Sequence, residues 1–305
     1  MRNSVVLSST RPVPAPPRPP ATVTTPDDVA ATRALWVRLG LVVAAIAIAY
    51  GSVIAEMAAE WVEFPNLSHG FAIPVIAGYL VWIRRQRIAA TACNPAWSGL
   101  PVLAAGVGLC AAGALGGETF LSRISLPVSI VGAVALVTGW RIVWLLLPAT
   151  AYLLLMIPLP YVALKTLTEQ ARGLDAAAAA AVLGWLGIPV FRDGFVLQLP
   201  RIALEVADVC SSIPGTLSLL ALGAAYGLVT WRPNAVRLAL VLAAIPLGVA
   251  SNIVRIVLTA IAADHLGPVA LNNLIHKSSG TTVFLMTFGA LASLDSALRR
   301  WWRSR

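Results

Sequence analysis

The stretch VRLALVLAAIPLGVASNIVRIVLTAIA, from Val236 to Ala262, decides the fold class. Between Arg237 and Arg255 it contains no charged side chain. A helix needs roughly 20 mostly apolar residues to cross the hydrocarbon core of a bilayer, because each residue adds about 1.5 Å of length. This stretch is therefore predicted to be a membrane-spanning helix.

The rest of the 305-residue chain has the same character. Hydrophobic residues make up 58% of it and charged residues 11%, with a mean hydropathy of +0.82. A soluble domain has about a quarter of its residues charged, so this chain carries too much apolar surface for one water-soluble core. We expect an all-α polytopic membrane protein of about eight transmembrane helices, with a larger outer (periplasmic) segment before the sixth. The predicted spans cover residues 34–54, 68–83, 97–115, 121–139, 142–159, 211–230, 236–262 and 281–298.

Basic residues set the expected orientation. Arginine and lysine in short loops stay in the cytoplasm, and the clusters at residues 84–87, 231–237 and 299–305, together with Arg141, all fall on one side of the predicted spans. We expect a multi-pass protein of the inner (cytoplasmic) membrane with both termini in the cytoplasm. The net charge of +9 is explained in the same way, and no nucleic-acid partner is expected.

Three regions follow along the chain. The proline-rich residues 1–33 are expected to form a disordered cytoplasmic tail, residues 34–298 the transmembrane domain, and residues 299–305 a basic cytoplasmic C-terminus. Within the outer segment, the helical spacing and polar stripe of residues 161–187 predict a helix along the outer membrane interface. Asp193 and Gly194, flanked by apolar residues, predict a short hairpin.

One cysteine lies at the outer mouth of the sixth predicted span, in the sequence EVADVCSSIPG of residues 205–215. Taken alone, Cys210 is open to three interpretations: a packing residue, half of a disulfide, or a nucleophile. The dipole and N–H groups of a helix N-terminus stabilise a thiolate, which favours the third. Cys110, inside an apolar helix, is expected to pack as a small hydrophobe, and Cys93 falls in a cytoplasmic loop. Three cysteines argue against a disulfide framework.

Arg255 is a lone arginine within the seventh predicted span. Placing an arginine inside the bilayer costs several kcal/mol of free energy unless the side chain faces a partner or a water-filled cavity. Helical spacing puts Asn252 and Thr259 on its face, which favours a buried role, and snorkelling to the outer interface remains the alternative.

Three histidines, His69, His265 and His276, fall on the outer side in the expected topology. A cysteine peptidase needs a thiolate, a histidine that moves a proton, and a donor for the developing oxyanion. Residues on this membrane face can fill all three roles. No GxSxG elbow, metal-ligand spacing or nucleotide-binding motif is present, so no cofactor and no metal are expected. The supporting residues expected near the site are Asn252, His69, Glu205, Asp208 and His265.

Four motifs in order resemble the exosortase/archaeosortase family over about residues 36–298. They are LSHGFAIPVIAGYLVW (67–82) followed by RRQR, GFVLQLPRIALEVADVCSSIPG (194–215), SNIVRIVLTA (251–260) and HKSSG (276–280). The resemblance implies a membrane-embedded cysteine protease or transpeptidase whose active site faces outside. It implies that Cys210 is the nucleophile, that Arg255 is the family's arginine in N-x-x-R, and that His276 is the catalytic histidine, with His265 as a rival.

The resemblance also implies the partners. They are exported proteins that end in a short motif such as Pro-Glu-Pro, a transmembrane helix embedded in membrane lipid, and a basic tail. A thioester acyl-enzyme would be resolved by water or by an amine-bearing acceptor. The chain departs from the pattern at Ser212, where the family often has glycine, and at Lys277. A transporter or assembly protein for extracellular polysaccharide remains the alternative, because many apolar spans with sparse polar residues fit it too.

Overall fold

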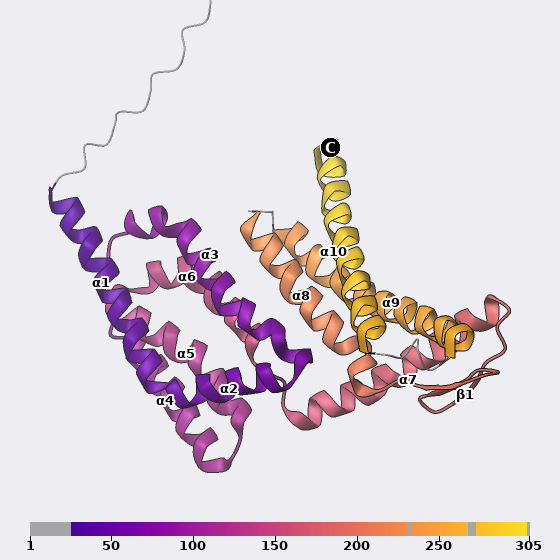
Figure 1. The fold of residues 1–305 in the computed structure, drawn as a ribbon. Helices are drawn as coiled ribbons and strands as arrows, with labels where there is room; N and C mark the ends of the chain where they lie inside the picture. The colour runs from indigo at the N-terminus through magenta and orange to yellow at the C-terminus, as the bar shows by residue number, and fades with distance from the viewer. Residues whose placement is uncertain (1–25, 231–233, 268–272, 304–305) are drawn as a thin grey trace, which may run out of the picture.

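The computed structural model describes residues 26–230, 234–267 and 273–303, and Figure 1 shows them as a mostly helical chain. In chain order the elements are α1 (Pro26–Ala49), α2 (Gly51–Glu63), the 3-10 helix η1 (Pro65–Phe71), α3 (Ala72–Ala89), α4 (Gly99–Gly116), α5 (Thr119–Thr138), α6 (Trp140–Tyr152), η2 (Leu153–Met156), α7 (Tyr161–Trp185), β1 (Phe191–Asp193), β2 (Val196–Gln198), β3 (Ala203–Glu205), η3 (Asp208–Cys210), α8 (Ser212–Val229), α9 (Asn234–Leu266) and α10 (Asn273–Arg303). A small three-stranded sheet lies between α7 and α8 in the chain.

Among the described residues, six helices are long and apolar enough to cross a membrane. A seventh span results if residues 140–156 and α7, which are bent by 73° at a short break, count as one. These helices fit an all-α polytopic membrane protein, although the predicted number of eight is not confirmed. The eighth predicted span falls within α10. The six are residues 29–49, 67–89, 99–116, 119–138, 212–229 and 234–266.

Helix α1 begins earlier than the predicted first span. The sequence Pro26-Asp27-Asp28 explains the start, because proline suits the first helical position and carboxylates favour the positive end of the helix dipole. Residues 26–33 are therefore helical rather than part of the tail, whose residues 1–25 lie outside the described part. The chain then breaks at Tyr50, so the predicted first span is divided between α1 and α2.

Helices α4 and α5 pack closely because glycine and serine line their contact. A Cβ on Gly106 would collide with Ser129, and one on Gly113 with Ser122. Small residues let two helix backbones approach within a membrane, where apolar burial alone gives little preference for helix pairing. The break predicted near residues 139–142 is real and lies at Gly139, whose φ of 97° suits glycine.

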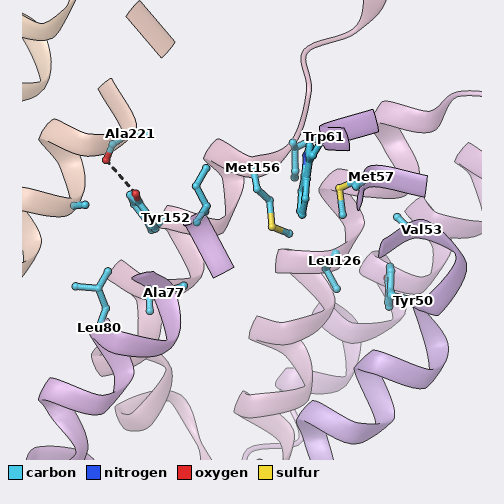
Figure 2. Packing of buried hydrophobic residues seen from close by; sticks show 14 residues of the cluster. Tyr50, Val53, Met57, Trp61, Ala77, Leu80, Leu126, Tyr152, Met156 and Ala221 are labelled. Carbon is cyan, nitrogen blue, oxygen red and sulfur yellow. Dashed lines mark hydrogen bonds between the residues drawn. The ribbon is translucent and has the colours of Figure 1, made fainter. Parts of the chain in front are cut away.

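The N-terminal helices contact the C-terminal half through a buried cluster that includes Met57, Trp61 and Met156 (Figure 2). Its link to the C-terminal half is Tyr152 of α6, whose hydroxyl donates to the carbonyl of Ala221 in α8 at 3.1 Å. A buried tyrosine hydroxyl needs such an acceptor, since an unpaired one loses its hydrogen bonds to water. The contact therefore fixes α8 against the first half of the protein.

Helix α7 runs crosswise to α8 in Figure 1 and carries the small sheet at its C-terminal end. The predicted helix and hairpin are both present. The turn residues are Gly194 and Phe195, one position later than predicted, because Asp193 pairs with Val196. Gly194 has a φ of 58°, which glycine adopts readily. A third strand, β3, was not predicted; it pairs antiparallel with β2 and leads into η3 and α8.

Candidate functional site

The segment from Glu205 to Ser212 connects β3 to α8 and carries Cys210 at its last turn. The single-turn helix η3 ends at Cys210, whose N–H donates to the carbonyl of Ala207 at 2.8 Å. Ser211 is extended, with φ −70° and ψ 161°, and Ser212 is the first residue of α8. The thiol therefore lies immediately before a helix N-terminus, as the sequence predicted.

Arg172 of α7 holds the first half of this segment. Its Nε donates to the carbonyl of Val206 at 2.6 Å, and its two terminal nitrogens contact Asp208 at 2.5 Å and Glu205 at 3.2 Å. The guanidinium also lies 4.2 Å from the ring centroid of Phe195, in a cation–π contact. Its planar, forked donors allow one side chain to bind three groups at once. Glu205 and Asp208 are thus partners of Arg172.

Asp175, one turn further along α7, binds the second half of the segment from Glu205 to Ser212. Its carboxylate is 1% exposed, and Oδ2 accepts hydrogen bonds from the N–H of Ser212 at 2.7 Å and from Nδ2 of Asn252 at 2.9 Å. Ser212 is helical, so the position does not require the backbone freedom of glycine. The hydrogen bond to Asp175 comes from the backbone N–H of residue 212, which serine and glycine supply equally, so the departure at Ser212 leaves this contact intact.

Asn252 of α9 connects this carboxylate to the candidate nucleophile. Its Nδ2 donates one hydrogen to Asp175 and the other to the carbonyl of Cys210, at 2.8 Å. Asn252 is buried, and both of its donors are used. The backbone of Cys210 is therefore fixed by a side chain from a different helix.

Cys210 and Arg255 line the same cavity, which has a volume of about 260 Å³. Its wall is formed by β3, η3 and one face of α9, including Thr259. The Nη2 of Arg255 is buried and has no hydrogen-bond partner within the part of the chain that the structure describes. Arg255 thus lies against the cavity, as predicted for a buried role. Arg255 and Thr259 line the cavity together, whereas Asn252 is not among its lining residues and binds the carbonyl of Cys210.

Burial raises the pKa of the Cys210 thiol, while the positive charge of Arg255 lowers it and offsets part of the rise. A hydrogen bond from the backbone of Ala207 to the sulfur and the charge of Arg172 lower the pKa of the thiol as Arg255 does. The net direction is upward, because burial outweighs the two positive charges and the hydrogen bond. A thiol in this state needs a base before it attacks a carbonyl.

The histidines take three different positions. His69, in η1, has Nδ1 at 3.4 Å from the hydroxyl of Ser218, and it is not among the residues that line the Cys210 cavity. His265 is exposed near the end of α9 and is not among them either. His276 is in α10, and its side chain lies outside the described residues. Its role as catalytic histidine therefore stays a prediction.

The other two cysteines pack with apolar neighbours. Cys110 lies beside the cluster that contains Met57 and Trp61, and Cys93 beside a second apolar cluster around α1 and α5. Within the described ranges, no three histidine, cysteine or carboxylate side chains gather as a set of metal ligands. Two ionisable groups, Arg172 and Asp175, are hydrogen-bonded to the segment that carries Cys210.

A family model described as "Transmembrane exosortase" matches residues 61–293. The chain belongs to the transmembrane exosortase family. The matched range begins at the last turns of α2 and ends within α10, so it includes all of the Cys210 cavity and both of its anchors on α7. No curated relative and no solved structure matches the chain.

Arg172 and Asp175 are the members of this candidate site that sequence reasoning missed. Both were counted as part of a polar stripe facing the membrane surface. Their spacing of three residues was readable as one helical face, and the alanine-rich run after Asp175 indicates a closely packed helix. Their partners could not be read, because these lie more than 30 residues away in the sequence.

Proposed function

We propose that this protein is a membrane cysteine protease or transpeptidase that cleaves the C-terminal sorting signal of exported proteins. One observation carries the proposal: Cys210 and a buried guanidinium nitrogen of Arg255, with no partner in the described chain, border one cavity. A nucleophile beside an unused donor is the arrangement that stabilises the oxyanion formed when a carbonyl is attacked. Membership of the transmembrane exosortase family supports the same reaction class.

The reaction begins with removal of the Cys210 proton, for which we propose His276 as the base. The sulfur then forms a bond to the scissile carbonyl carbon, and the carbonyl π electrons move to oxygen, where Arg255 donates a hydrogen bond. Collapse of this intermediate breaks the C–N bond, and the leaving amine takes the proton from the histidine. Water or an amine-bearing acceptor then displaces the thioester sulfur and releases the enzyme.

The hydrogen bonds around Cys210 suit this chemistry. Asn252 and Asp175 hold the backbone on the C-terminal side of the cysteine, and Arg172 holds it on the other side. A thiol fixed at both ends of its segment loses little conformational entropy when the substrate arrives. A transporter or assembly protein for polysaccharide gives no reason for this arrangement, and the family match does not favour it.

The expected setting is the inner membrane, with both termini in the cytoplasm and the Cys210 cavity open to the outer side. The substrate tail helix would enter the bilayer beside the enzyme, and its cleavage motif would lie at the outer interface. A cysteine accessibility assay on intact cells with a membrane-impermeant thiol reagent tests the orientation. Labelling of Cys210 only after cell lysis would contradict it.

The experiment that tests the function is isolation of the acyl-enzyme. A tagged exported protein ending in Pro-Glu-Pro, an apolar helix and arginines is co-expressed with the full chain, and Cys210 peptides are analysed by mass spectrometry. We expect a substrate fragment attached to Cys210 and loss of tail cleavage in Cys210→Ala. Cys110→Ala is the matched control and should process normally. Normal cleavage by Cys210→Ala would overturn the proposal.

A further inference from the structure

Strand β3 is an edge strand that no neighbouring strand covers within the described residues. The sheet order is β1-β2-β3, and β3 pairs only with β2. In an antiparallel pair, alternate residues direct their N–H and C=O groups toward the partner strand. The bonds Val206 N–H to Phe195 and Leu199 N–H to Ile202 fix this alternation.

The alternation leaves two residues of β3 directed away from β2. Residues 202, 204 and 206 bond to β2, so the N–H and C=O groups of Ala203 and Glu205 point to the opposite side. Both residues are exposed. The side chain of Glu205 contacts Arg172, so the outer edge of the strand presents backbone hydrogen-bonding groups rather than an unpaired charge.

This open edge borders the cavity of Cys210. The lining includes the four consecutive residues Ala203, Leu204, Glu205 and Val206. A cavity lying against one face of a strand would meet alternate residues, because successive side chains point to opposite faces. Contact with consecutive residues therefore places the cavity along the edge of β3, next to the thiol.

We propose that the substrate polypeptide binds as an added strand along β3, in extended form, and so brings its scissile carbonyl to Cys210. The inference rests on the proposed function and adds the mode of substrate recognition. The occupant is one extended backbone segment of the protein to be cleaved. Its N–H and C=O groups pair with those of Ala203 and Glu205, which are spaced two residues apart as in any strand.

Strand addition explains how a short motif can be held beside a helix-rich site. Main-chain hydrogen bonds give affinity without regard to side chains, and an extended peptide leaves each carbonyl accessible to a nucleophile at the side. Arg255 and Thr259 on α9 then face the peptide from across the cavity. Without such an occupant, an unprotected edge strand tends to pair with strands of other chains.

The test uses two thiol reagents on the full chain in detergent micelles. The rate of Cys210 labelling by iodoacetamide measures only the reactivity of the thiol. The rate with acetyl-Ala-Ala-Ala chloromethyl ketone measures that reactivity together with binding of the peptide backbone. The thiolate forms a C–S bond to the chloromethyl carbon as chloride leaves. Ala203→Pro removes only the outward N–H of β3, and proline is tolerated on an edge that faces away from its partner. Arg192→Pro makes the matching change on the opposite edge, because the backbone of Arg192 points away from β2.

We expect Ala203→Pro to slow labelling of Cys210 by the peptide reagent about fivefold, the effect of losing one hydrogen bond, without changing iodoacetamide labelling. Arg192→Pro should change neither rate. As a measurement independent of folding, N-methylation of the peptide reagent at its central amide should slow its reaction with the unmodified protein. Equal peptide-reagent rates for the natural chain and Ala203→Pro would overturn strand addition, as would equal rates for the two peptides. If iodoacetamide itself fails to label Cys210, the proposed function fails instead.

Discussion

The side-chain nitrogen of Asn252 lies 2.8 Å from the carbonyl oxygen of Cys210, so helix α9 holds the backbone of the candidate nucleophile directly. The same nitrogen donates to Asp175 on α7. Three segments far apart in the sequence therefore meet at one amide group.

Replacing Asn252 by aspartate should abolish processing and destabilise the fold. The two side chains have nearly the same shape, but aspartate has no N–H donors and puts a second carboxylate beside Asp175. The carbonyl of Cys210 loses its donor and Asp175 keeps only the N–H of Ser212; one unpaired buried acceptor costs about 1–3 kcal/mol, and the charge repulsion adds to this. Thermal unfolding in detergent measures this. Asn234→Asp, an exposed asparagine at the start of the same helix, should leave the unfolding temperature unchanged.

Replacing Arg172 by lysine should loosen the segment before Cys210. Lysine keeps the charge but loses the forked donors and the stacking on Phe195. We expect faster hydrogen exchange across residues 203–211 and a slower processing rate, by about tenfold if the nucleophile is misplaced. Arg192→Lys is the control, because Arg192 is exposed on β1 and its side chain donates to the carbonyl of Gly194, two residues along the same hairpin. Unchanged exchange in Arg172→Lys would contradict the anchoring role.

The two roles of Arg255 should separate in their dependence on pH. Its charge lowers the pKa of Cys210, which burial raises, so Arg255→Gln should raise that pKa further. Less thiolate is then present at pH 8, and iodoacetamide labelling should slow severalfold there. The two proteins should converge at high pH, where both thiols are ionised. Arg255→Lys should keep the natural labelling profile yet lose processing, because it retains the charge without the planar donor.

Stability should depend on which glycine of α4 is changed. A methyl group on Gly106 collides with Ser129 of α5, whereas one on Gly108 meets nothing within 4 Å. We expect Gly106→Ala to destabilise the protein by about 1–3 kcal/mol, the usual cost of overpacking, and Gly108→Ala to have little effect. Thermal unfolding of the two variants in the same detergent is the measurement. Equal unfolding temperatures would contradict the close packing of α4 on α5.

Apolar runs predicted most of the helices, because the length of a bilayer span leaves few alternatives for such runs. The helix at residues 161–187 and the hairpin at Asp193 and Gly194 were also predicted from local patterns. Strand β3 was missed, because three residues before a polar segment carry no clear alternation. The start of α1 at Pro26 was missed because the proline content upstream obscured the Pro-Asp-Asp start signal.

The candidate site was predictable only in part. Cys210, Arg255 and Asn252 could be found because polar side chains within or beside apolar runs are rare. His69 and His265 are not among the residues that line the Cys210 cavity. Helical and loop position put them on the predicted outer side, but a shared membrane face does not fix distance. Arg172 and Asp175 needed the folded chain, since their roles depend on partners brought together by the crossing of α7 with α8 and α9.

The anchoring of Cys210 has a consequence for protein engineering. The backbone between Val206 and Ser212 is held by two side chains one turn apart on α7 and by Asn252 on α9, so the position of the reactive cysteine depends on both helices. Moving the sequence EVADVCSSIPG into another scaffold would carry the thiol without its geometry. A chimera that exchanges α7 together with residues 191–215 and keeps an asparagine at position 252 should keep the loop conformation, whereas one that exchanges the loop alone should not.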